Sequence, residues 1–342
     1  MGHDVLVTAA SRRVALVTAL RDALARHAPG SRVIATDISP WSPAVHLADC
    51  ARRVPRSDDP RYVEALLEIC EAEGVRLLVP TIDDELDVIA CARPQFEARG
   101  VAVAVSSVET IRLCRDKALT SLHLARHGIP AAMTWTPETL DVDGVALPVF
   151  IKPRRGRGSV GAHAAHTRED LRFFLRHVAD PVIQTYLHAP EYTIDLFCDR
   201  SGAPISVVPR ERQVIRAGVT DRGRTVRDQR LIDLGLACAR AFSFRGAVNL
   251  QCRMVDETPV IFEINPRFSG GIQLTMAAGA DFADWLVRES RGEWLVPCVG
   301  AFTDGMYMSS YETSLFFTER PDCVLAPPVE RVLPLRMARV RS

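Results

Sequence analysis

The sequence predicts an α/β protein with a parallel, doubly wound sheet in its first third and an α+β arrangement in its C-terminal part. Short apolar segments at residues 5–8, 33–36 and 77–79 alternate with segments of helical spacing. Strands that alternate with helices favour a parallel sheet. Later in the chain, residues 191–197 alternate as a half-buried antiparallel strand does. A chain of 342 residues is long enough for two or three domains.

Composition limits the classes of partner. Lys+Arg and Asp+Glu both number 42, so the formal net charge is zero and we expect no nucleic-acid partner. We find no run of about 18 apolar residues, so no membrane span or membrane partner is expected. The N-terminus leads directly into a strand without a signal-peptide pattern. Nine dispersed cysteines without a CxxC pair indicate reduced thiols and a cytoplasmic location.

The first third continues with helices expected at residues 14–27, 62–72 and 85–96 and a fourth strand at 101–105. This pattern is Rossmann-like. However, the turn at residues 9–13 has no glycine and no GxGxxG motif. Since that motif lets the backbone approach a pyrophosphate, the sequence argues against a dinucleotide cofactor.

Ligands of open α/β sheets bind at the carboxyl ends of the strands, where this chain carries Asp83 and Glu85. Two interpretations stay open for these acids. They could receive a substrate amine, or they could cap the helix that starts near Glu85, with Asp83 as its N-cap.

The middle of the chain offers two lysines and a glycine-rich loop. Lys117 lies in a helix-rich segment at 108–127, and Lys152 ends a short strand at 149–153. The loop that follows contains Gly156, Gly158 and Ser159, whose backbone N–H groups could wrap anionic oxygens. It is not a P-loop, because no GK[ST] follows a glycine. A solvated basic turn is the alternative interpretation.

Further elements are expected as a helix at 168–177, strands at 182–187, 191–197 and 203–209, and a helix at 229–242. Between the last two elements, residues 210–227 are expected to form a loop rich in arginine.

The most informative segment is a predicted hairpin with strands at 246–254 and 259–265. If it centres on Glu257, Gln251 lies opposite Glu263 and Asn249 lies opposite Asn265. Residues two apart on a strand share a face, so a carboxylate and amides gather on one surface. Such hard oxygen ligands suit Mg²⁺, and Arg267 follows on the same parity.

This order of features resembles the ATP-grasp superfamily, above all the ATP-grasp halves of carbamoyl-phosphate synthase large chains and related single-unit ligases. The resemblance covers roughly residues 4–290. It implies an ATP-grasp fold with a Rossmann-like pre-ATP-grasp domain at 1–107. A small lid subdomain with its linker helix would follow at 108–187, and a large subdomain with a C-terminal extension at 188–342.

The resemblance also implies roles for individual residues. Phosphate contacts would come from Lys117 and Lys152, the lid from Gly156, Gly158, Ser159 and Val160, the adenine-side connector from Gln184, Thr185, Tyr186 and Leu187, and the ribose ligand from Glu191. Two Mg²⁺ ions, or Mn²⁺ in their place, would be held by Gln251, Glu263 and Asn265, with Glu263 bridging, while Arg267 stabilises the transferring phosphoryl group. Many relatives have an acid where Thr185 stands, so adenine recognition there would rest on backbone groups or a water.

The implied function is an ATP-dependent ligase that joins a small-molecule carboxylate to an amine through an acyl phosphate. Arginines bind carboxylates bidentately, and the candidates for this contact are Arg210, Arg212, Arg216 and Arg227. Two other readings stay open: a carbamoyl-phosphate-synthase-like enzyme that phosphorylates bicarbonate or carbamate, and a non-catalytic ATP sensor. At the C-terminal end, residues 306–317 are expected to form a strand pair or a homodimer surface, and residues 331–341 a final strand.

Overall fold

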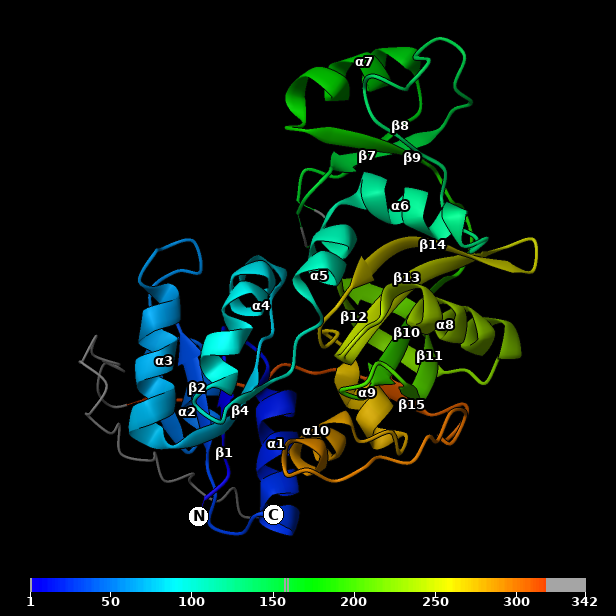
Figure 1. Cartoon of the computed structure of the whole chain (residues 1–342). Coiled ribbons are helices and arrows are strands. Elements are labelled where there is room, and N and C mark those ends of the chain that lie inside the picture. Colours follow the sequence, from blue (N-terminus) through cyan, green and yellow to red (C-terminus); the bar gives the residue numbers. More distant parts are fainter. Residues whose placement is uncertain (1, 157, 159, 318–342) are drawn as a thin grey trace. The chain divides into compact units, whose positions relative to one another are not determined.

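The computed structural model describes residues 2–156, 158 and 160–317 (Figure 1). The chain divides into two compact units. The first contains the chain up to Val105, the segment Asp281–Leu295 and the described residues from Tyr311 onward. The second contains Ser106–Ala280 and Val296–Ser310. The segment Asp281–Leu295 therefore belongs with the first unit, whereas the division expected from the sequence puts it in the large subdomain.

The first unit is built on a five-stranded parallel sheet of order β3-β2-β1-β4-β5. Its strands are β1 (Asp4–Val7), β2 (Val33–Asp37), β3 (Cys50–Arg53), β4 (Val75–Val79) and β5 (Ala102–Val103). Its helices are α1 (Val14–His27), α2 (Pro43–Leu47), α3 (Tyr62–Glu73), α4 (Asp83–Glu97) and α10 (Phe282–Ser290). Strands added on both sides of β1 are typical of a doubly wound sheet, so the expected fold class is confirmed.

The start of α4 corrects one expectation. Ile82 occupies the N-cap position and Asp83 is the first helical residue, so Asp83 is not the N-cap. Glu85 supplies the capping contacts instead. Its Oε1 accepts hydrogen bonds from the backbone N–H groups of Thr81 (2.7 Å) and Ile82 (3.1 Å). A carboxylate at this position satisfies N–H groups that have no partner inside the helix.

The second unit contains a four-stranded antiparallel sheet of order β6-β9-β7-β8. Its strands are β6 (Thr134–Trp135), β7 (Val149–Pro153), β8 (His163–Ala165) and β9 (Pro181–Thr185), and α7 (Arg168–His177) packs against it. The helices α5 (Val108–Arg115) and α6 (Lys117–Arg126) precede this sheet in the chain.

The same unit holds a six-stranded antiparallel sheet of order β14-β13-β10-β11-β12-β15. Its strands are β10 (Glu191–Cys198), β11 (Pro204–Arg216), β12 (Val219–Thr225), β13 (Gly246–Val255), β14 (Thr258–Asn265) and β15 (Tyr307–Ser309). The helix α8 (Gln229–Phe242) packs on one face of this sheet, and the short α9 (Ile272–Ala277) follows β14 (Figure 1). Gly235 allows α8 to come close, because a Cβ there would lie 2.6 Å from Val207 Cγ1.

Residues 210–227 form strands rather than the expected loop. β11 runs on to Arg216 and pairs with β12 across a tight turn at Ala217 and Gly218. Both turn residues have positive φ, +47° and +77°, as two-residue hairpin turns require. β15 then pairs with β12, so one strand rather than a pair adds to this edge. The strand expected at residues 331–341 lies outside the described residues.

Candidate functional site

Strand register gathers the predicted functional residues on one face of the six-stranded sheet. Gln251 pairs with Glu263 on β14 and with Thr193 on β10. Thr193 pairs in turn with Arg210 on β11. Residues directly opposite in an antiparallel sheet share a face. Two of the predicted metal ligands, Gln251 and Glu263, therefore lie in one cross-strand row with Arg210, the first of the predicted substrate arginines.

A β-bulge produces the predicted pairing. From the turn outward, Val255 pairs with Thr258 and Cys252 with Ile261, which alone would place Gln251 opposite Phe262. The register shifts between Gln251 and Cys252, so that Gln251 faces Glu263. The expected pairs Gln251–Glu263 and Asn249–Asn265 are thus confirmed, although the hairpin turn lies at Asp256–Glu257. The bulge keeps Glu263 on the polar face.

The extra residue of the bulge, Phe262, contacts Lys152. The Lys152 ammonium donates to the Phe262 carbonyl oxygen (3.2 Å) and lies 5.6 Å from the centre of its ring. Lys152 is only 6% exposed. Burial lowers the pKa of this lysine to about 8; the charge of Glu263 opposes that shift, Lys117 adds to it, and Glu191 opposes it. The charges of Glu263, Lys117 and Glu191 therefore all act on Lys152.

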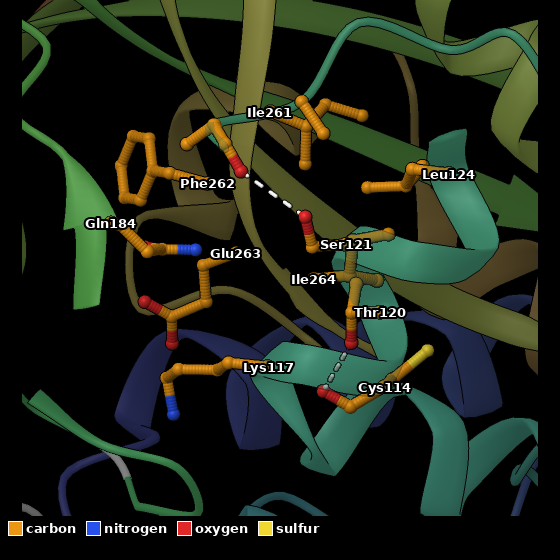
Figure 2. A pocket seen from close by; sticks show the side chains of 12 residues that line it. Cys114, Lys117, Thr120, Ser121, Leu124, Gln184, Ile261, Phe262, Glu263 and Ile264 are labelled. Carbon is orange, nitrogen blue, oxygen red and sulfur yellow. Dashed lines mark hydrogen bonds between the residues drawn. The ribbon is translucent and has the colours of Figure 1, made fainter. Parts of the chain in front are cut away.

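Lys117 and Gln184 line a small cavity together with Glu263, and Figure 2 shows these three side chains beside one another. The cavity measures about 10 Å³, room for roughly one water molecule. The Lys117 ammonium donates to the carbonyl oxygen of Gly156 (3.1 Å), at the start of the glycine-rich loop. Gln184 Nε2 donates to Thr134 Oγ1 (2.9 Å). Binding of an adenine here requires these side chains to separate.

The glycine-rich loop is anchored at its first residues. Asp116 is the N-cap of α6, and its two carboxylate oxygens share the single Nε–H of Arg154, each at 2.8 Å from Nε. The Lys117 backbone N–H donates to the Arg154 carbonyl oxygen (3.2 Å). Arg154 therefore fixes the end of β7 beside Lys117. Of the predicted loop residues, Gly156, Gly158 and Val160 are described, whereas Ser159 lies outside the described residues.

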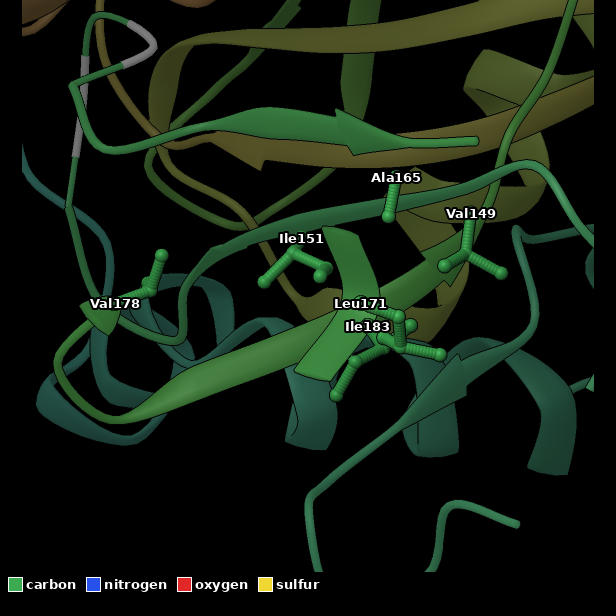
Figure 3. Packing of buried hydrophobic residues seen from close by; sticks show 6 residues of the cluster. All are labelled: Val149, Ile151, Ala165, Leu171, Val178 and Ile183. Carbon is green, nitrogen blue, oxygen red and sulfur yellow. The ribbon is translucent and has the colours of Figure 1, made fainter. Parts of the chain in front are cut away.

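The strand that carries Lys152 is held by an apolar core of its own. Figure 3 shows this cluster, in which β7, β8, α7 and β9 each contribute buried side chains. Its members are Val149, Ile151, Ala165, Leu171, Val178 and Ile183. Alternation along β7 sends Val149 and Ile151 into this core and Lys152 to the other face.

The connector follows directly from this sheet. β9 ends at Thr185, whose backbone N–H donates to the Met133 carbonyl oxygen (3.0 Å). The Thr185 side chain is exposed, whereas Tyr186 and Leu187 are half-buried. The ring of Tyr186 lies 6.3 Å from that of Phe150 on β7.

Glu191, the predicted ribose ligand, is held between two arginines. Its Oε1 accepts from Arg212 (2.6 Å) and its Oε2 from Arg253 (2.5 Å). Burial lowers the pKa of Arg212, and the charge of Glu191 opposes that shift. The sequence reasoning missed Arg253, although its parity with Gln251 places it opposite Glu191. A ribose can reach Glu191 only where one of these arginines gives way.

Arg210 does not face a substrate in this structure. It is 1% exposed, and its Nε donates to Asp195 Oδ2 (2.7 Å), which is equally buried. Its Nη2 donates to Ser269 Oγ (2.9 Å), and Thr275 on α9 donates to Asp195. These contacts are internal, so Arg210 forms a buried ion pair that joins β10 and β11 to the segment after β14.

Two other predicted substrate arginines also have local contacts. The Arg227 guanidinium donates to the Phe302 carbonyl oxygen and lies 5.3 Å from the centre of the Phe302 ring. Arg216 is exposed near the β11–β12 turn, 3.7 Å from Asp221. Of the four predicted substrate arginines, Arg212 fits the prediction best, because it is buried and the charge of Glu263 acts on it.

In the first unit, Glu85 is fully buried and accepts a hydrogen bond of 2.5 Å from the Tyr62 hydroxyl. Burial raises its pKa, and the hydrogen bonds from Tyr62, Thr81 and Ile82 oppose that shift. All of these contacts are internal, so the capping interpretation describes Glu85 and the amine-binding one does not. Asp83 is 9% exposed at the start of α4.

The predicted metal ligands comprise one carboxylate and two amides with adjacent positions on the sheet face. Arg267 Nη2 donates to Asn265 Oδ1 (3.2 Å), and Asn265 Nδ2 donates to Asn249 Oδ1 (3.4 Å). This set of oxygen donors fits Mg²⁺, which commonly takes one or two carboxylates and completes its shell with phosphate oxygens and waters. Asn265 Oδ1 would have to exchange Arg267 for the ion.

Two parts of the chain match models of known protein families. Residues 177–313 match a family model described as ATP-grasp in the biosynthetic pathway with Ter operon. Residues 5–104 match one described as PylC-like, N-terminal domain. The biotin carboxylase domain dimer of Hydrogenobacter thermophilus 2-oxoglutarate carboxylase, solved with MgADP, ADP and bicarbonate, superposes with a TM-score of 0.72. That likeness covers 90% of this chain and 73% of the other at 18% identity, and shows the fold.

The matches to curated relatives cover a smaller part of each chain. The "Putative D-alanine--D-lactate ligase" of Streptomyces coelicolor is 29% identical over 128 residues, which is 36% of this chain and 37% of that protein. The carbamoyl phosphate synthase large chain of Agathobacter rectalis is 23% identical over 216 residues, which is 57% of this chain and 20% of the other. The chain thus spans well under half the length of either relative. Among the described helices, none has the length and apolar character needed to cross a membrane.

Proposed function

From the premise that the chain combines a PylC-like N-terminal domain with an ATP-grasp domain, we propose that it is an ATP-dependent ligase. The proposed reaction joins a small-molecule carboxylate to an amine through an acyl phosphate. The observation that carries the proposal is the bulged hairpin, which sets Glu263 beside Gln251 on the face toward which the buried Lys152 is directed. This arrangement supplies charge for phosphoryl transfer, which requires positioning and neutralisation rather than a protein nucleophile.

In the proposed reaction, a substrate carboxylate oxygen attacks the γ-phosphorus of ATP and ADP leaves. The amine nitrogen then attacks the acyl carbon, phosphate leaves, and the nitrogen loses a proton. Lys117 and Lys152 bind phosphate oxygens, and Arg267 stabilises the charge that develops on the transferring group. Magnesium, held by Glu263, Gln251 and Asn265, would neutralise phosphate charge. Arg212 is the proposed carboxylate ligand once ATP draws Glu191 away.

The test measures ADP release by the purified chain with Mg-ATP and a panel of carboxylates and amines. We expect release that depends on both a carboxylate and an amine. An ATPase rate that ignores every added amine would contradict the ligase. Tight ATP binding without turnover under any mixture would favour a nucleotide sensor instead.

Oxygen labelling separates the ligase from a bicarbonate- or carbamate-phosphorylating enzyme. A carboxylate labelled with ¹⁸O transfers label to the released phosphate if the acyl phosphate forms. Transfer from labelled bicarbonate, with none from the carboxylate, would identify the second reaction. The biotin carboxylase neighbour was solved with bicarbonate, so the experiment with labelled bicarbonate is needed as well.

We further propose a cytoplasmic location, supported by the dispersed cysteines of the sequence.

A further inference from the structure

An open pocket of about 400 Å³ lies in the first unit, at the edge of the sheet where its strands begin. It is lined by Gly2, His3, Arg76, Gly100, Ala102, Ser290 and Arg291. His3 precedes β1, Arg76 is the second residue of β4, and Ala102 begins β5. Because these strands are parallel, the pocket lies at the edge opposite the carboxyl ends, where ligands of such sheets normally bind.

Two arginines of this pocket, Arg76 and Arg291, have no acidic partner in the part of the chain that the structure describes. Three acids close in sequence to the residues that line the pocket are each paired with another arginine. Asp4 accepts from Arg32 (2.8 Å), Glu73 pairs with Arg32 (3.0 Å), and Glu293 accepts from Arg288 (2.8 Å). Among the described residues, the two guanidinium groups that line the pocket thus have no carboxylate in contact with them.

The charges of Arg76 and Arg291 both act on the side chain of His3. Its Nε2 lies 2.7 Å from Ser290 Oγ, whose own hydrogen is donated to the Val287 carbonyl oxygen (2.8 Å). Nε2 is therefore the donor. Burial lowers the pKa of His3, and the charges of Arg291 and Arg76 lower it further. Both guanidinium groups act on the same buried ring, which is 9% exposed.

Gly100 makes room for one of these arginines. It has φ +74°, and a Cβ there would lie 2.9 Å from Arg76 Nη1. A larger residue would be strained at this φ and would also displace the guanidinium. Arg291 follows the C-terminal end of α10, where a cation is favourable even without a ligand. Arg76 lies at the start of a strand, where no helix end favours a cation.

We propose that this pocket binds a small phosphate-bearing anion. A phosphate presents several acceptor oxygens and close to two negative charges, which match the two guanidinium forks. A monocarboxylate could neutralise only one of the two arginines. The proposal concerns the first unit alone and does not depend on the proposed ligase activity.

The test follows the ring resonances of His3 by NMR in the full chain during titration with inorganic phosphate at constant ionic strength. We expect a saturable shift and a rise in the His3 pKa, because the anion offsets both arginine charges. Arg76→Gln and Arg291→Gln should each weaken binding at least about tenfold. Lys152→Met, which alters only the proposed nucleotide site, should leave this response unchanged. A parallel titration with glycerol phosphate distinguishes free phosphate from a phosphate ester, according to which binds more tightly.

The matched control is Arg99→Gln, which removes the same charge next to Gly100 from a residue that does not line the pocket. It should change the affinity by less than about twofold. Equal weakening by all three arginine variants, or a shift that never saturates, would show non-specific screening and overturn the proposal. Equal binding of acetate and phosphate would overturn the assignment to phosphate.

Discussion

Lys152 couples the candidate site to pH. The pKa of its buried ammonium is lowered to about 8, so the folded chain binds this proton less tightly than the unfolded one. Between about pH 8 and the ordinary pKa of lysine near 10.4, the unfolded state holds more protons, and unfolding free energy rises with pH in that window. Below it, the buried charge costs about 3 kcal/mol of stability. That charge is retained at a place where phosphates are proposed to bind.

We predict that Mg-ATP affinity changes little below about pH 7 and falls as the pH rises through about 8, because neutral Lys152 no longer attracts phosphate. Binding at pH 8 should also take up roughly half a proton, measured by calorimetry in buffers of different ionisation enthalpy. Lys152→Arg keeps the charge throughout this range and serves as the control. An unchanged proton uptake in that variant would contradict the role of Lys152.

Glu263 is the single carboxylate among the proposed metal ligands. We predict that Glu263→Gln lowers turnover at least about 10³-fold, because the amide no longer neutralises the metal ions, with the thermal unfolding transition unchanged. The matched control is Glu257→Gln, the same chemical change in the exposed turn of the same hairpin, where the side chain pairs with Arg230. Turnover should be unaffected there. A Glu263→Gln variant with full activity would refute the assignment.

At the scale of elements, the hairpin shows what sequence reasoning can and cannot reach. Parity along β13 and β14 predicts which residues share a face, and the pairs Gln251–Glu263 and Asn249–Asn265 are confirmed. The bulge at Gln251 and Cys252 is a local defect that hydrophobic alternation does not encode. The hairpin was therefore predicted to centre on Glu257, whereas its turn lies at Asp256–Glu257, and the predicted pairs beyond the bulge are confirmed.

Other predictions were wrong for different reasons. The part of β11 from Arg210 onward and all of β12 were predicted as a loop, because these residues are rich in arginine and lack the apolar alternation that marks a strand. The role of Arg210 was misjudged because its partner Asp195 is distant in sequence and becomes its neighbour only in the sheet. Local sequence patterns predict which residues share a face of a strand and where helices begin and end. They do not predict which side chains pair across the sheet, because that depends on how the strands are aligned in the fold.

The Arg210–Asp195 pair gives a prediction for the sheet as an element. Arg210→Met should lower the unfolding free energy by about 3–5 kcal/mol, because Asp195 is left as a buried charge without its cation. Arg216→Met, on the exposed end of the same strand, should change it by less than about 0.5 kcal/mol. Chemical denaturation measures both. Similar losses in the two variants would show that strand propensity, rather than the ion pair, sets the effect.

At the scale of the whole molecule, two compact units need not unfold together. We predict that Mg-ATP at about 100 times its Kd stabilises the second unit by about 2.7 kcal/mol. Hydrogen exchange should slow in β13 and β14 and remain unchanged in β1 and β4. Lys152→Met should abolish this protection. Uniform protection of both units would contradict a nucleotide site confined to the second.

The return of α10 to the first unit bears on how this protein is made. During synthesis, β1 and α1 leave the ribosome long before α10, whose Asp284 pairs with Arg26 and His27 of α1. The first unit thus waits from Val105 to Asp281 for the segment that carries α10, and the strands β6 to β14 of the second unit, which lie between in the chain, can pair before it arrives. Exchange of the leading hundred residues between relatives by recombination would separate α1 from the helix that it evolved to contact.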